Sequence, residues 1–220
     1  MPKLPYLAGA EMRSIIGCSL VLLLIACGNT PPVPDWQMNA KSSMERAQSA
    51  YLEGMTSVEA VEFARARKEV ASTGRADLIA RCAKRVASLV FEDCTAYAPL
   101  AQDAAAPERA YADYLAGKAQ AKDAALLPKQ HRVVAEAAAS TPDLKAVADP
   151  LARLMAAGVL MQTDRADPAT IATAIDTASA QGWRRPLLVW LGVQAQRAEA
   201  TGDATEVARI RRRIVGWVRV

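Results

Sequence analysis

Apolar residues recur at intervals of three and four along most of the chain, a spacing typical of amphipathic helices. Alanine is abundant and β-branched residues do not cluster, so the composition also favours helix over strand. The stripe is clearest near the carboxyl terminus, where it consists of Val207, Ile210, Ile214 and either Trp217 or Val218. The pattern therefore predicts an all-α protein whose helices pair as antiparallel hairpins joined by tight turns.

The ends of the predicted helices have residues suited to those positions. In the first half of the chain the spacing predicts helices over residues 39–54, 57–70 and 76–90, with Ser57 as the cap of the second. Farther along, six prolines are interpreted as first-turn residues, where the missing amide costs nothing. They are Pro107, Pro128, Pro142, Pro150, Pro168 and Pro186. Asp149 and Asp167 each precede one of them, at the position of an N-cap.

The same periodicity predicts which faces are buried. The helix after Asp167 should turn inward Ile171, Ile175 and Ala178, and the helix after Pro186 should turn inward Leu187, Leu191, Ala195 and Ala198. In the helix over 57–70 the expected apolar face consists of Ala60, Phe63 and Val70, and the expected water-facing residues are Glu62, Arg65 and Lys68.

One segment of the chain resembles another. Met44–Gly54, MERAQSAYLEG, aligns without gaps on Pro107–Gly117, PERAYADYLAG, with identical Glu, Arg, Ala, Tyr, Leu and Gly. The similarity fades downstream. Two interpretations stay open: an internal duplication, or two unrelated amphipathic helices that both end in glycine.

Residues 13–27, RSIIGCSLVLLLIAC, depart from the amphipathic pattern. A basic residue is followed by an apolar run from Ile15 to Ile25 and then by a small residue, an order typical of an export signal. The run is too short to span a bilayer core, which takes roughly 20 residues. Because charged residues precede Met12, translation could start at Met1 or at Met12.

The end of this run, Leu24-Ile25-Ala26-Cys27, resembles the lipobox of bacterial lipoproteins. The resemblance implies that Cys27 is acylated with fatty acids such as palmitate and that cleavage makes it the first residue. The predicted organisation is a signal peptide at 1–26, a lipidated, proline-rich linker at 27–38 and a helical domain at 39–220. In such lipoproteins an Asp after the cysteine often causes inner-membrane retention, so Gly28 implies an outer-membrane anchor on the periplasmic face. The alternative is an ordinary secretory signal, but no A-x-A cleavage site lies nearby.

The last predicted hairpin, WLGVQAQRAEATGDATEVARIRRRI, resembles a tetratricopeptide unit in its Trp-Leu-Gly, its Gly-Asp turn and its small residues. The segment AYLEGMTSVEAVEFARA resembles such a unit less closely. No regular period of about 34 residues runs through the chain, so another α-solenoid or an irregular helical bundle is the alternative. The chain as a whole is also similar to bacterial lipoproteins of unassigned activity.

Cys82 and Cys94 follow the predicted signal, and an exported protein meets oxidising conditions in which disulfides persist. Eight residues of helix rise about 12 Å, and the four residues from Phe91 to Cys94 can span about 13 Å. A disulfide is therefore allowed if the chain folds straight back, and two independent half-buried thiols are the alternative. A zinc site would need four ligands, so we expect no metal.

The chain offers little for catalysis. His131 is its only histidine, and no nucleophile or orienting carboxylate is marked beside it, so a packed or solvated side chain is expected. Nucleotide-binding, serine-hydrolase and zinc-protease motifs are absent. The formal net charge of +4 is small for a nucleic-acid binder. We therefore expect no enzyme activity, no cofactor and no nucleic-acid partner.

The densest charge cluster consists of Arg209, Arg211, Arg212 and Arg213. On an amphipathic helix these residues form the solvated face, or they contact an anionic surface such as lipid headgroups or an acidic partner. Together these features predict a membrane-anchored envelope lipoprotein that acts as a non-catalytic protein-interaction or assembly module. The alternatives are a structural envelope lipoprotein without a dedicated partner and, less favoured, an enzyme that acts on peptidoglycan.

Overall fold

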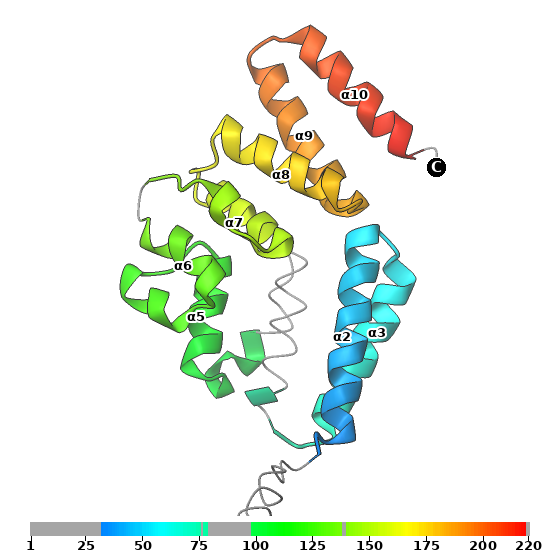
Figure 1. Ribbon diagram of the computed structural model, residues 1–220, viewed down its shortest axis with the longest axis vertical. Helices are drawn as coiled ribbons and strands as arrows, with labels where there is room; N and C mark the ends of the chain where they lie inside the picture. Colours follow the sequence, from blue (N-terminus) through cyan, green and yellow to red (C-terminus); the bar gives the residue numbers. More distant parts are fainter. Residues whose placement is uncertain (1–31, 76, 79–97, 138–139, 219–220) are drawn as a thin grey trace, which may run out of the picture. The chain divides into compact units, whose positions relative to one another are not determined.

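Every regular element that the structure describes is a helix, which confirms the prediction of an all-α fold (Figure 1). The structure is a computed structural model, and it describes residues 32–75, 77–78, 98–137 and 140–218. Cys27, Cys82, Cys94 and most of the predicted helix over 76–90 lie outside these ranges. Asp35–Val220 forms one compact unit.

The helices follow one another along the chain with short connections. The α-helices are α2 (Asp35–Glu53), α3 (Thr56–Ala71), α5 (Ala106–Leu115), α6 (Lys129–Glu136), α7 (Pro150–Gln162), α8 (Pro168–Ala180), α9 (Arg184–Ala200) and α10 (Ala204–Val218). The 3₁₀ helices are η1 (Ala98–Asp103), η2 (Ala121–Leu126) and η3 (Leu144–Ala146). None of the described helices is both long enough and apolar enough to cross a bilayer.

The predicted aspartate caps are confirmed. Oδ1 of Asp149 accepts a hydrogen bond from the Ala152 amide at 2.6 Å, and Oδ1 of Asp167 accepts one from the Thr170 amide at 2.7 Å. Asp203 does the same at the start of α10, because its Oδ1 lies 2.9 Å from the Glu206 amide. These side chains satisfy amides that a helix leaves unbonded in its first turn.

Several predicted boundaries differ from the structure. α2 begins at Asp35 rather than at residue 39, so the predicted linker ends earlier, and α9 begins at Arg184, before Pro186. The apolar run after Pro142 forms only the 3₁₀ turn η3, because the next proline, Pro150, starts a new helix.

The main hydrophobic core is formed by α5 to α10, with α7 and α8 at its centre. Ile171, Ile175 and Ala178 are buried as predicted, and so are Leu187, Leu191, Ala198, Val207 and Ile210. Ala195 and Ile214 are partly buried against the same core. Four alanines of α7 and α8 are completely buried: Ala156, Ala157, Ala174 and Ala178. Small residues at these positions allow two helices to pack closely.

The helices of the carboxy-terminal half pack in chain order. α7 packs on α8, α8 on α9, and α9 on α10. Figure 1 shows α9 and α10 as an antiparallel hairpin, and α2 and α3 as another. Packing of each helix on the next is the arrangement of α-solenoids and stacked hairpins. The predicted hairpin architecture is therefore present, and a tetratricopeptide repeat remains a prediction.

The α2–α3 hairpin corrects the predicted face of its second helix. Glu62 is buried and Ala60 is exposed. Burial of Glu62 is tolerated because its carboxylate accepts hydrogen bonds from Arg46 at 2.9 Å and Arg65 at 2.8 Å. α3 also begins at Thr56, and Met55 rather than Ser57 is at its N-cap.

The two similar segments end in the same way. The Gly54 amide bonds to the Tyr51 carbonyl, and the Gly117 amide bonds to the Tyr114 carbonyl. Both glycines have positive φ, of 84° and 69°, which favours glycine because it has no Cβ. After this shared turn the chain continues as α3 in one case and as η2 in the other. The shared turn explains why both segments end in glycine, whether or not they arose by duplication.

Candidate functional site

The arginine cluster on α10 is partly neutralised by acidic residues of its own hairpin. Arg209 donates two hydrogen bonds of 2.6 Å to the Glu206 carboxylate, one turn earlier on the same helix. This pairing raises the pKa of Arg209, and it lowers the pKa of Glu206. Arg211 reaches across to α9, where it lies 2.8 Å from Glu199.

The remaining two arginines, Arg212 and Arg213, form fewer polar contacts. Arg212 is exposed and forms no hydrogen bond or ion pair with any residue that the structure describes. Arg213 is half-buried, and its charge contributes to the lowered pKa of Glu206. The four arginines therefore do not act as four equal free charges.

An open groove of about 590 Å³ lies beside the turn between α9 and α10. Its lining consists of Glu199, Gly202, Ala204, Val207, Ala208, Arg211 and Arg212. Two of the predicted arginines thus border an apolar strip of small side chains. Such a combination suits a peptide segment that presents apolar side chains together with carboxylates.

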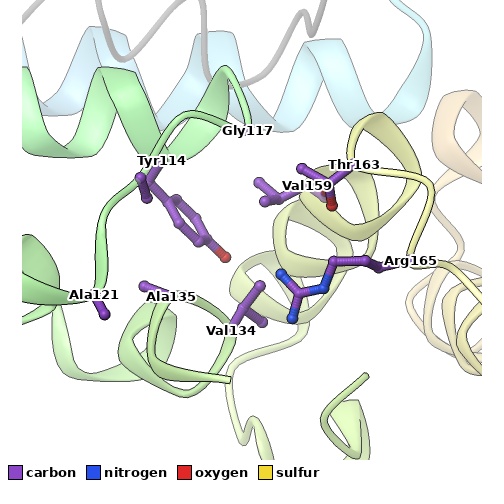
Figure 2. A pocket seen from close by; sticks show the side chains of 9 residues that line it. Tyr114, Gly117, Ala121, Val134, Ala135, Val159, Thr163 and Arg165 are labelled. Atoms are coloured by element: carbon purple, nitrogen blue, oxygen red, sulfur yellow. The ribbon is translucent and has the colours of Figure 1, made fainter. Parts of the chain in front are cut away.

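A second and smaller hollow, of about 200 Å³, lies between α5, α6 and α7 (Figure 2). Its walls are mostly apolar, and it is lined by Tyr114, Gly117, Ala119, Ala121, Val134, Ala135, Val159, Thr163 and Arg165. Figure 2 shows the Tyr114 hydroxyl and the Arg165 guanidinium pointing toward each other across the hollow. We call it the α5–α7 cavity.

Neither of these polar groups is fully satisfied within the described chain. Tyr114 is completely buried, and its hydroxyl has no hydrogen-bond partner. Nε of Arg165 is also buried without a partner, whereas its Nη2 donates to the Ser140 carbonyl. The backbone of Arg165 is held in addition by the Thr141 hydroxyl, at 2.8 Å. Arg165 is therefore anchored at two points, and its guanidinium points into the hollow (Figure 2).

Gly117 allows the end of α5 to approach the end of α7 closely. A Cβ added to Gly117 would lie 2.8 Å from Cγ2 of Thr163, closer than carbon atoms can approach. Its φ of 69° is also in the left-handed region. This glycine therefore positions the rim of the α5–α7 cavity for steric as well as conformational reasons.

His131 lies behind the cavity wall, in an aromatic cluster. Its ring centroid lies 5.2 Å from that of Tyr111 and 5.1 Å from that of Tyr114. Nε2 is 3.4 Å from the Tyr111 hydroxyl, and Nδ1 has no partner among the residues that the structure describes. Burial lowers the pKa of His131 to about 4, against a smaller opposing effect of Asp149. The imidazole is therefore neutral at physiological pH. Of the two arrangements expected from the sequence, packed or solvated, it adopts the packed one.

The sequence did not indicate the α5–α7 cavity. Tyr114 in α5 and Arg165 in the connection between α7 and α8 are far apart in the chain and match no motif. For Gly117 the sequence indicated only the end of a helix. Among the described residues, no cluster of three histidine, cysteine or acidic side chains could hold a metal ion.

Comparison with known proteins finds no family model, no curated protein and no solved structure that matches this chain significantly.

Proposed function

We propose that the chain is a lipid-anchored envelope protein, acylated at Cys27, whose helical domain is a non-catalytic module that binds a partner protein. The proposal of partner binding is based on the α9–α10 groove, an apolar strip bordered by Arg211 and Arg212. The lipobox-like Leu24–Cys27 and Gly28 support the anchor and its outer-membrane location.

The groove favours a partner segment that is both apolar and acidic. Ala204 and Ala208 are exposed along it, and Val207 forms its buried base. Arg212 can pair with an incoming carboxylate without giving up a partner in the described part of the chain. Arg211 can exchange its pairing with exposed Glu199 at little cost, because surface ion pairs contribute only about 0–1 kcal/mol. The positive edge would also accelerate association with an acidic segment.

A lipid headgroup is a less suitable occupant. Headgroup binding needs several free cations at one surface, whereas the groove presents only two arginines beside apolar side chains, and the nearby Arg209 is paired with Glu206 through two hydrogen bonds. Lipid binding is therefore an outcome that the experiments below can separate from binding of a partner protein.

The anchor is tested by feeding cells radiolabelled palmitate and fractionating their membranes. We expect label on the full-length chain, none on a Cys27→Ala variant, and the labelled protein in the outer membrane. A Gly28→Asp variant should keep the label and move toward the inner membrane. An unlabelled, unprocessed wild-type chain would contradict the anchor.

The groove is tested in intact cells with a photo-crosslinking residue at Ala208. We expect one discrete protein adduct, which is lost in the Arg211→Gln/Arg212→Gln variant. The matched control is Arg67→Gln/Lys68→Gln, which removes two exposed cations from α3 and should leave the adduct unchanged. An adduct that both double variants leave intact would contradict the proposal, and so would crosslinks to lipid alone.

A further inference from the structure

The α5–α7 cavity combines an unpaired hydroxyl with an inward-pointing guanidinium in an apolar setting. The Tyr114 hydroxyl is buried without a partner among the described residues and points into the cavity (Figure 2). The Arg165 guanidinium points into the cavity from the opposite side, with its terminal nitrogens nearest the hydroxyl. Buried polar groups in folded proteins are almost always hydrogen-bonded. An unpaired hydroxyl and a cation that face one hollow therefore indicate a binding position for a molecule that supplies the acceptor.

The chemistry of the two groups limits what that acceptor can be. The guanidinium only donates hydrogen bonds, and the phenol can donate one. Burial raises the pKa of Tyr114, so its proton is retained. Arg165 is positively charged and forms no ion pair with any described residue, and no carboxylate lines the cavity. An anionic acceptor satisfies both donors and balances the charge.

The size and walls of the cavity select among anions. An apolar cavity of about 150 Å³ can hold a benzene molecule, and the α5–α7 cavity, at about 200 Å³, has space for a body of that size with a small head. Val134, Val159 and the alanines supply apolar contacts around most of it. A phosphate would need more donors than these walls offer, whereas two donors match the two oxygens of a carboxylate.

We propose that the α5–α7 cavity binds a small carboxylate with a compact apolar body. Its oxygens accept hydrogen bonds from the Tyr114 hydroxyl and the Arg165 guanidinium, and its body lies against Val134 and Val159. This site is distinct from the α9–α10 groove, so it does not depend on the proposed partner binding.

The probe for this site is sodium benzoate, titrated into the isotope-labelled full-length chain and followed by amide chemical shifts. We expect saturable shifts at Gly117 and Val159, with a dissociation constant in the millimolar range or tighter. Arg165→Gln should weaken binding at least tenfold, and Tyr114→Phe roughly threefold to tenfold. Arg165→Lys should bind less tightly than wild type, because the charge remains but the planar guanidinium with its fixed donors is lost.

Three comparisons test whether the observed binding belongs to this cavity. Unliganded Tyr114→Phe should melt no lower than wild type, since the change removes an unpaired hydroxyl, and this checks that the variant folds. Arg212→Gln, in the α9–α10 groove, should bind benzoate as tightly as wild type. Benzyl alcohol has a similar body without the charge and should bind at least tenfold more weakly. Equal binding of benzyl alcohol, absence of saturable shifts, or unchanged affinity in both cavity variants would overturn the proposal.

Discussion

The α2–α3 hairpin and the α7–α8 pair show two ways in which an alanine-rich sequence can form packed helices. α7 has 13 residues and buries eight of them, among them Leu154, Met155 and Leu160, because it has neighbours on several sides. α2 has 19 residues and buries four, three of which are serine or alanine. The first pair is held by apolar burial, and the second depends more on polar contacts.

The hairpin also has its own small core. Ala66 and Val70 form a cluster with Ala40, Met44 and Leu78, separate from the main core. Two helices alone seldom bury enough apolar surface to be stable. The difference indicates that the hairpin needs its contacts with α9, where Arg185 lies 2.8 Å from Glu59 and 4.3 Å from the centre of the Tyr51 ring.

The largest expected change in stability comes from shortening a buried side chain of α7. Leu160 is completely buried, so Leu160→Ala should lower the free energy of unfolding by about 2–5 kcal/mol through lost burial and a residual cavity. Urea denaturation measures the change. Val61→Ala in α3, where the side chain is 51% exposed, is the control and should change stability by less than about 0.5 kcal/mol. Equal costs would remove the distinction between the two regions.

An intermediate effect should come from acid, through His131. The folded state holds the pKa of His131 at about 4, below the ordinary value of 6.5, because burial disfavours the imidazolium. The unfolded chain therefore binds a proton first as the pH falls, so this contribution is complete above 6.5 and is lost toward 4. We expect roughly 2 kcal/mol less stability at pH 5 than at pH 7.5.

Equilibrium unfolding at a series of pH values measures this loss. The loss of stability in this pH range can be assigned to His131 because it is the only histidine in the sequence. A His131→Gln variant should show a flatter profile between pH 5 and 7.5, and a variant with the wild-type slope would contradict the assignment.

The smallest effect is expected where the hairpin meets α9. Arg185→Gln removes the ion pair with Glu59 and the contact over the Tyr51 ring, and it should cost roughly 1–2 kcal/mol, since the ion pair is only partly exposed. Hydrogen exchange should accelerate in α2 and α3 while α7 and α8 keep their protection. Arg184→Gln is the neighbouring control. Uniform acceleration across the whole chain would show that the hairpin is no separate unit of stability.

Much of the local structure was predictable from the sequence because it depends on neighbouring residues. Period and composition identified an all-helical chain, and Asp149 and Asp167 marked helix starts since a cap needs only an aspartate and a free amide. The apolar stripe of α9 was predicted correctly for the same reason. The lipobox-like segment at 24–27 is likewise a local pattern, and its predicted acylation lies outside the described residues.

Only the tertiary structure decided which polar groups share a buried space. Glu62 was predicted to face water, and it is buried because Arg46 from another helix reaches it. Arg212 and Arg209 look alike in the sequence but differ in whether an acidic residue lies within reach. Tyr114 and Arg165 meet across one cavity because α5 and α7 pack side by side, a contact that no local pattern specifies. Burial and charge pairing depend on neighbours in space, whereas caps and stripes depend on neighbours along the chain.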